Sequence, residues 1–192
     1  MRRAGKLIIF LGIFLILVSL VILVSLHVST YRGELEVSEI LTRLKDLLPP
    51  ESVGMPEERY SVEMPVLEIG GKDIIALLGI PSSNIELPVV SEWNRKTLIS
   101  LPQRASGGVY DSSLVIGGYD REGQFDCLSK LDVGNEIFVT DMMGAKFSYT
   151  VSEIQRKKFI EEEVLYNSDS ALTLFVRDLD TMEYIVVYCI YH

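Results

Sequence analysis

Residues 114–131, LVIGGYDREGQFDCLSKL, hold the pattern on which the interpretation of this 192-residue chain depends. The apolar run Leu114–Ile116 leads into the glycine pair Gly117–Gly118, and a charged loop follows. The segment ends in FDCLSKL, whose apolar spacing is typical of a short helix. We therefore predict a buried strand, a glycine turn, a charged loop and a short apolar helix.

Short β-rich runs recur on both sides of this segment. Glycine, proline, aspartate and Asn-Ser signals separate them, and DMMG (141–144) and DLDTM (178–182) indicate hairpin turns. This recurrence predicts a mainly β domain, an antiparallel sandwich or barrel. The predicted strands are VLEIG, IIALLGI, IELPVV, SLVIGG, EIFVTD, KFSYTVSEIQ, KFIEEEVLY, LTLFVRD and EYIVVYCIY.

The N-terminal part predicts a single transmembrane helix over residues 7–26, which are 20 residues without a charge. A helix of about 20 residues is long enough to cross the hydrocarbon core of a bilayer. A cleaved signal peptide is the alternative, but its apolar core spans only about 7–15 residues. The following SLHVSTYRG also contains no A-x-A-like cleavage site.

The orientation of this helix follows from the basic residues beside it. Arg2, Arg3 and Lys6 precede the apolar run, and few basic residues follow it directly. Because Lys and Arg accumulate on the cytoplasmic flank, residues 1–6 are expected in the cytoplasm. The main domain is then expected on the extracytoplasmic side of the cell membrane.

Residues 27–64 are expected to form a stalk. VSEILTRLKDLL (37–48) has its apolar residues on one helical face. PPESVGMPEERYSVEMP (49–65) contains four prolines, which end the helix and indicate a linker. The alternative for the short helix is packing on the domain formed by residues 65–192.

The charge of the outer part argues against nucleic-acid binding. The net charge of −9, less the three basic residues of the N-terminus, leaves −12 for the remainder. Such a surface repels phosphate backbones. Three consecutive acids at 161–163 are interpreted as protection of a strand edge, with a surface for a basic partner as the alternative.

The few cysteines and histidines restrict the available chemistry. Cys127 and Cys189 could form one disulfide, but two small buried apolar residues are the preferred interpretation. The only histidines are His27 and His192, so residues 28–191 contain none.

Several segments, taken in order over residues 66–190, resemble the sortase family. ALLGIPSSNIELPVV (76–90) resembles the opening strands of sortases, and LVIGGYDREGQFDCLSKLDVGNEIFVT (114–140) resembles their strand, Phe-x-x-Leu helix and Leu-x-x-Gly-Asp-x-Ile strand. YTVSEIQ and ALTLFVRDLDTMEYIVVY resemble the remaining strands. The resemblance implies a sortase-like closed β-barrel with one or two short helices.

Sortases cleave a sorting signal such as L-P-x-T-G and join the acyl fragment to an amine, using a cysteine, a histidine and an arginine. By the resemblance, the histidine position holds Tyr119, the cysteine position Arg177, and the arginine position Glu183 or, with a shift of one residue, Tyr184. Tyrosine, with a pKa of about 10, is a poor base near neutral pH. Arginine cannot act as the nucleophile, and a glutamate repels an oxyanion.

The resemblance therefore implies a catalytically inactive protein that acts by binding. The implied partners are a surface protein, a sorting-signal peptide or an active sortase. Groove-binding candidates are Tyr119, Arg177 and Trp93, where Trp93 is either a core cap or an exposed anchor. The alternative is an active cysteine transpeptidase with an atypical catalytic set that uses Cys127 or Cys189.

No cofactor is expected apart from a weak calcium candidate. Because calcium takes oxygen ligands, and some sortases hold calcium near the groove, four loop acids are considered: Asp120, Glu122, Asp178 and Asp180. The alternative is that these acids are solvated and stabilise turns. An ion pair of Arg177 with Glu183 or Asp178 is a further expectation.

Overall fold

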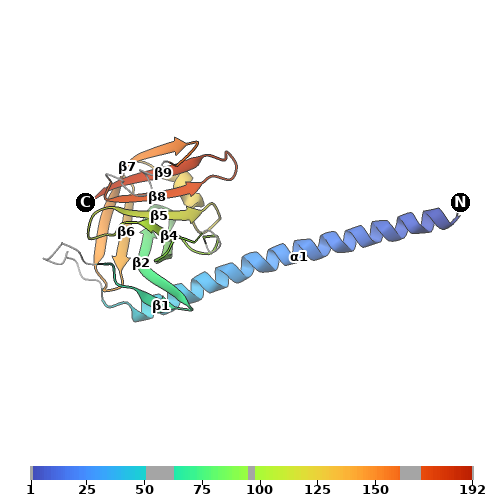
Figure 1. Cartoon of the computed structure of the whole chain (residues 1–192), viewed down its shortest axis with the longest axis horizontal. Coiled ribbons are helices and arrows are strands. Elements are labelled where there is room, and N and C mark those ends of the chain that lie inside the picture. The colour runs from blue at the N-terminus through green and yellow to red at the C-terminus, as the bar shows by residue number, and fades with distance from the viewer. Residues whose placement is uncertain (1, 51–62, 95–97, 161–169, 192) are drawn as a thin grey trace. The chain divides into compact units, whose positions relative to one another are not determined.

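The computed structural model describes residues 2–50, 63–94, 98–160 and 170–191. Within this part, helix α1 (Arg2–Leu47) precedes nine strands and two short 3-10 helices, η1 (Pro81–Ser83) and η2 (Asp126–Lys130) (Figure 1). The strands are β1 (Leu67–Ile69), β2 (Lys72–Ile80), β3 (Ile85–Val90), β4 (Gln103–Ser106), β5 (Leu114–Tyr119), β6 (Glu136–Asp141), β7 (Lys146–Lys157), β8 (Leu172–Arg177) and β9 (Tyr184–Tyr191).

The nine strands form one sheet that closes on itself. Their order is β1-β2-β3-β4-β5-β8-β9-β7-β6, and β2 also pairs with β6. This last pairing joins Ala76–Gly79 to Phe138–Asp141, so strands β2 to β9 make a closed barrel and β1 extends its margin. The prediction of a mainly β closed barrel is confirmed.

The expected antiparallel pairing holds for most of the barrel but not at two pairings. β3 runs parallel to β4, and β5 runs parallel to β8. The second pairing becomes possible because η2, β6 and β7 lie between β5 and β8 in the chain, which is the long crossover that parallel strands need. Strand β4, QRAS, was not predicted, because it is short and carries no apolar alternation.

The interior of the barrel is filled by alternate residues of the strands, as the period of two requires. Within the segment 114–131, the strand and the short helix form as predicted (β5 and η2), but the predicted glycine turn was wrong, because Gly117 and Gly118 lie within β5. Phe125, from the loop between β5 and η2, is fully buried. Other fully buried side chains are Ile74, Leu78, Ile80, Leu114, Ile116, Val139, Leu174, Val187 and Cys189.

The chain divides into two compact units, residues 1–38 and 39–192. The end of α1 belongs to the second unit, where Ile40 and Leu44 are buried. Packing on the domain, the alternative considered for the helix at 37–48, is therefore the arrangement seen from residue 39 onward. Most of the proline-containing linker and the acids at 161–163 lie outside the described residues.

The predicted membrane span lies within helix α1. Among the residues that the structure describes, no helix meets the length and hydropathy required of a membrane span. The anchor over residues 7–26 stays a prediction.

A buried carboxylate closes the β6–β7 hairpin. Oδ1 of Asp141, which is fully buried, accepts hydrogen bonds from the backbone N–H groups of Met143 and Ala145, each at 2.8 Å. Its Oδ2 accepts the hydroxyl of Tyr110, whose ring packs edge-on against Phe147. One side chain therefore holds the DMMG turn and ties it to a distant loop.

We expect Asp141→Ala to lower the free energy of unfolding by about 3 kcal/mol, because three hydrogen bonds worth about 1 kcal/mol each are lost. Asp141→Asn, which keeps one acceptor oxygen, should lose less. Urea unfolding of the full chain in detergent measures both. Asp132→Ala, at an exposed aspartate, is the control, and an equal loss there would contradict this role.

Candidate functional site

The sheet places the positions singled out from the sequence side by side. Tyr119 at the end of β5 pairs with Arg177 at the end of β8, and Arg177 pairs with Tyr184 at the start of β9. Paired residues point to the same face of a sheet. Of the two candidates for the third position, Tyr184 is opposite Arg177, whereas Glu183 lies one residue earlier, in the hairpin loop.

Arg177 does not form the expected ion pair. Its guanidinium lies 6.0 Å from the centroid of the Tyr184 ring, and its side chain is exposed. Asp178 instead pairs with Arg156 of β7, at 3.0 Å. Within the part of the chain that the structure describes, no carboxylate lies in ion-pair contact with Arg177.

The hairpin that follows Arg177 explains why Asp178 is engaged elsewhere. Its Oδ1 accepts the backbone N–H groups of Asp180 and Thr181, at 2.9 and 3.0 Å. The hydrogen bond from Thr181 and the contact with Arg156 lower the pKa of the Asp178 carboxyl to about 2. Asp178 therefore stays charged and holds the predicted turn.

Asp120, in the loop after β5, also binds the β8–β9 hairpin. Its Oδ2 accepts the backbone N–H of Leu179 at 2.8 Å, so the loop after β5 is bonded to the β8–β9 hairpin. The described residues contain no group of three or more acidic, cysteine or histidine side chains placed to hold a metal ion. Calcium binding by Asp120, Glu122, Asp178 and Asp180 stays a prediction.

A buried glutamine that sequence reasoning missed holds the Tyr119 backbone. Oε1 of Gln124 accepts the N–H of Tyr119, and its Nε2 donates to the carbonyls of Leu98 and Ile99 at 3.4 and 3.3 Å. Gln124 is 3% exposed. The only sequence feature that could have indicated this role is the position of Gln124 directly before Phe125. Its hydrogen-bond partners Leu98 and Ile99 are far away in the sequence.

Trp93 covers Gly117 on the outer side of β5. Its ring lies 5.6 Å from that of Phe175, and 37% of the residue remains exposed. A Cβ on Gly117 would come within 2.5 Å of both rings, so only glycine permits this contact. On the inner side, a Cβ on Gly118 would come within 2.2 Å of Phe125.

The face that carries Tyr119 and Arg177 continues as an apolar strip, which we call the outer strip. Val115, Phe175 and Val186 form its buried centre, and its partly buried margin is made by Ala105, Ile160, Tyr184 and Tyr188. The strip therefore combines a packed apolar centre with half-exposed aromatic side chains, and it ends at an arginine.

Both cysteines are free and buried, as the preferred interpretation stated. Burial raises the pKa of the Cys127 thiol to about 11, with a further contribution from Asp126, and it raises the pKa of the Cys189 thiol to about 12. Because the thiolate is the nucleophile, both residues are poorly suited to attack a carbonyl near neutral pH.

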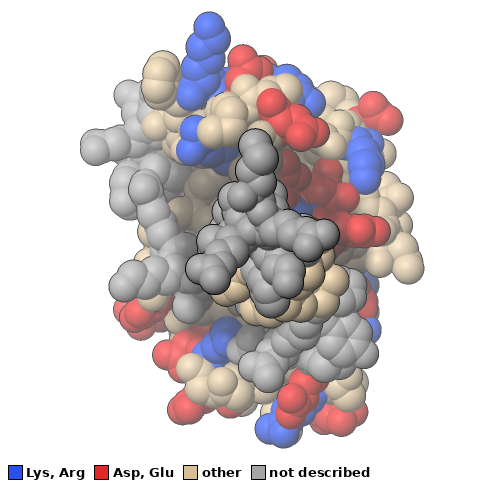
Figure 2. Space-filling view, turned by 90° about the vertical axis from the view of Figure 1, so that its right-hand side faces the viewer, with Lys and Arg blue, Asp and Glu red and all other residues tan. Residues whose placement is uncertain are grey.

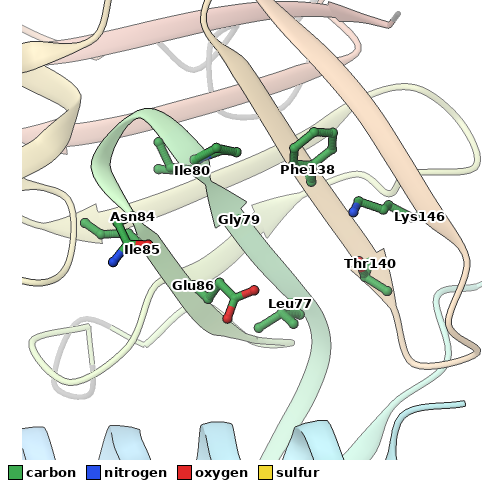
Figure 3. Close-up of a pocket in the computed structure, with 10 residues that line it drawn as sticks. Leu77, Gly79, Ile80, Asn84, Ile85, Glu86, Phe138, Thr140 and Lys146 are labelled. Carbon is green, nitrogen blue, oxygen red and sulfur yellow. The ribbon is translucent and has the colours of Figure 1, made fainter. Parts of the chain in front are cut away.

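A separate cleft of about 350 Å³ opens on the outer face of β3, β2, β6 and β7 (Figure 3). Phe138 lies on one side and Glu86 on the other, with Leu77 and Gly79 between them. Lys146 lies 4.5 Å from the centre of the Phe138 ring, and Glu86 pairs with Lys45 of α1. Both charged groups of the cleft are thus already engaged.

Charges of both signs are distributed over the surface. Figure 2 shows one face, on which Lys and Arg side chains are interspersed with Asp and Glu. No broad basic area is visible there, consistent with the net charge of −9.

No family model and no curated protein matches the chain. Sortase A from Corynebacterium diphtheriae has a similar structure, with a TM-score of 0.55 and 18% identity over 63% of this chain and 61% of that chain. Sortase A from Listeria monocytogenes gives 0.52 and 20%, over 62% and 87%. Sortase C from Clostridium perfringens gives 0.51 and 20%, over 62% and 70%.

These similarities show that the domain has the sortase fold, as the sequence resemblance implied. The match spans less than two thirds of the Corynebacterium protein's own length. At identities of 20% or less, the similarity extends to the fold alone.

We expect both thiols to resist modification by a disulfide reagent at pH 8 in the folded protein. The raised pKa values lower the thiolate fraction by roughly a hundredfold or more relative to an unperturbed cysteine, and burial blocks access. Unfolding in urea should release two reactive thiols per chain. The variants Cys127→Ser and Cys189→Ser show which thiol any observed labelling comes from. Rapid labelling of either thiol in the folded protein would contradict its role as a buried packing residue.

Gly117→Ala should displace Trp93 outward and lower the free energy of unfolding by roughly 1–3 kcal/mol, because the added methyl overlaps two rings. Trp93 is the only tryptophan, so its fluorescence emission should shift to longer wavelength. Gly79→Ala is the matched control, since a Cβ there makes only ordinary contacts of 3.7 Å or more. An unchanged emission of Gly117→Ala would contradict the contact.

Proposed function

We propose that this chain is a membrane-anchored, extracytoplasmic sortase-family protein that has lost transpeptidase activity and acts by binding. Its partner is a surface protein, a sorting-signal peptide or an active sortase. The observation that carries the proposal is the composition of one site. The sheet brings Tyr119, Arg177 and Tyr184 together, and the sequence resemblance to sortases implies that these positions correspond to the catalytic ones.

The chemistry of these residues supports binding over acyl transfer. A transpeptidase needs a nucleophile, a proton donor to the leaving amine, and a cation beside the developing oxyanion. Arg177 supplies a cation, but these three residues include neither a cysteine nor a histidine for the first two roles. Residues 28–191 contain no histidine that could take over.

The two cysteines do not replace the missing nucleophile in this proposal. Cys127 lies in η2, where its Sγ donates to the carbonyl of Gln124 at 3.3 Å. Cys189 is fully buried and pairs with Leu172 and Val151 inside the sheet. Neither thiol belongs to the face that carries Arg177.

The structure around Tyr119 and Arg177 supports a binding role for this face. Gln124, Asp120 and Asp178 hold the ends of β5 and β8 and the following hairpin with side-chain hydrogen bonds. The outer strip offers half-buried aromatic surface beside this held end. Aromatic and arginine side chains of this kind are common anchors at protein interfaces.

Anchoring to the membrane rests on the sequence. The uncharged run at 7–26 has the length of a span, and the basic residues before it indicate a cytoplasmic N-terminus. The proposed location of the barrel is therefore the outer surface of the membrane, where sorting signals and surface proteins would be accessible.

The activity test incubates the full chain, in detergent, with an L-P-x-T-G peptide and hydroxylamine. We expect neither cleavage nor a hydroxamate product, because no reactive thiolate faces the site. An active sortase is the positive control. Cleavage that is abolished by Cys127→Ala or Cys189→Ala would overturn the proposal in favour of an active cysteine transpeptidase.

The binding test immobilises the full chain and measures retention of the same peptide and of a purified active sortase. We expect Tyr119→Ala with Arg177→Ala to reduce retention of one of them at least fivefold. Arg43→Gln, an exposed arginine on α1, is the control. No retention of either probe, or retention unaffected by the double variant, would contradict a binding role for this face.

A further inference from the structure

We propose that the barrel carries a docking surface for the end of α1, residues 39–48, and that this contact keeps the barrel bound to α1 after the chain is cut between residues 51 and 62. The partner of the surface is thus a segment of this same chain. The contact goes beyond the binding role of the face that carries Tyr119, because it concerns how the barrel is attached to the helix.

One face of the docked segment is buried, although the rest of it is exposed. Ile40 is 3% exposed and Leu44 is fully buried, and Leu41 and Leu48 are half-buried. These positions recur at intervals of three and four residues, so they form one stripe along the helix. Leu47, which lies outside the stripe, is 60% exposed. A stripe of this kind identifies the side of a helix that packs against a core.

The stripe is received by the margin of the barrel. Figure 1 shows the end of α1 beside β1, and a Cβ added to Gly70, in the β1–β2 turn, would lie 3.8 Å from Cγ1 of Ile40. Lys45 forms an ion pair with Glu86 of β3, but both of these side chains are 49% exposed. Because an ion pair this exposed contributes little to stability, we assign the attachment to the burial of Ile40 and Leu44.

The proline-rich segment that follows α1 has both of its ends on the barrel. The carbonyl oxygens of Pro49 and Pro50 would lie 3.0 and 3.1 Å from a Cβ added to Gly144, in the β6–β7 hairpin. At the other end, Met64 is 5% exposed, and its Cγ would lie 3.4 Å from a Cβ added to Gly108. The intervening residues therefore connect two points that each already contact the barrel.

A cut in this segment leaves the docking contacts in place. The contacts of Ile40, Leu44 and Lys45 described above are made with residues beyond 62, so none of them depends on an intact chain between 51 and 62. The uncut chain makes docking intramolecular, which raises the effective concentration of the segment at its surface. A cut removes this advantage, so a weakened contact shows itself in the cut chain.

The test introduces a site for a sequence-specific protease between residues 51 and 62 of the full chain, which is kept in detergent and captured by a tag at its N-terminus. We expect the barrel fragment to stay on the resin with the N-terminal fragment after cutting. Trp93, the only tryptophan, lies in the barrel fragment, and its unchanged fluorescence checks that the barrel stays folded. Release of most of the folded barrel fragment would overturn the proposal.

Matched variants on the same helix identify the docked face. Ile40→Ala with Leu44→Ala should raise the rate of release after cutting by roughly tenfold or more, because two buried aliphatic side chains are truncated. Leu47→Ala, the same substitution at an exposed leucine, is the control and should leave the rate unchanged. Retention that survives the double variant, or release that Leu47→Ala accelerates equally, would overturn the assignment to the buried face.

Thermal unfolding of each uncut variant checks that the barrel is intact before cutting. If the double variant does not fold, Ile40→Ala alone is used, and it should raise the rate of release by roughly threefold or more. An unchanged rate with this milder variant counts against the proposal in the same way.

The ion pair between Lys45 and Glu86 gives an independent readout. Salt at about 1 M screens charges on the surface, so it should change the rate of release by less than about twofold if apolar burial holds the segment. Glu86→Gln should have an equally small effect. Release of the barrel by salt or by Glu86→Gln would overturn the apolar basis of the contact and assign the attachment to the ion pair.

Discussion

The parallel ladder between β5 and β8 is the constraint on which the candidate site depends. Its register pairs Gly117 with Phe175 and Tyr119 with Arg177. A slip of one residue would turn every side chain of β5 to the opposite face. The glycine pair makes the register possible, because it admits Phe175 and Trp93 on one side and Phe125 on the other. The register of β5 and β8 therefore sets both the packing of these aromatic rings and the geometry of the site.

The electrostatics of the site follow from how the hairpin after β8 is built. Asp178 is turned into the loop by two backbone N–H groups and is held there by Arg156. Asp120 is held by Leu179. Asp178 and Asp120 are thus engaged by other groups, and no described carboxylate forms an ion pair with Arg177, so a cation remains available in a protein whose net charge is −9. A binding surface can use such an unpaired guanidinium, whereas an ion pair within the protein would have neutralised it.

Much of the barrel could be predicted because burial imposes a period of two on strands. Runs such as IIALLGI and LTLFVR carry that signal, and DMMG and DLDTM carry turn chemistry. β4 could not be predicted, because QRAS is held by backbone pairing with its neighbours rather than by apolar alternation. Gln124 was missed for a related reason, since its partners Leu98 and Ile99 are defined by the folded loop and by no sequence spacing.

The sequence by itself determined the strand pattern, the uncharged N-terminal run and the absence of histidine between residues 28 and 191. These follow from residue identity and periodicity. Only the tertiary structure decided that β5 and β8 run parallel, that Tyr184 rather than Glu183 is opposite Arg177, and that Asp178 pairs with Arg156. The physical reason is that pairing partners are chosen by distances between strands far apart in the chain. Those distances are set by sheet closure, which no local pattern encodes.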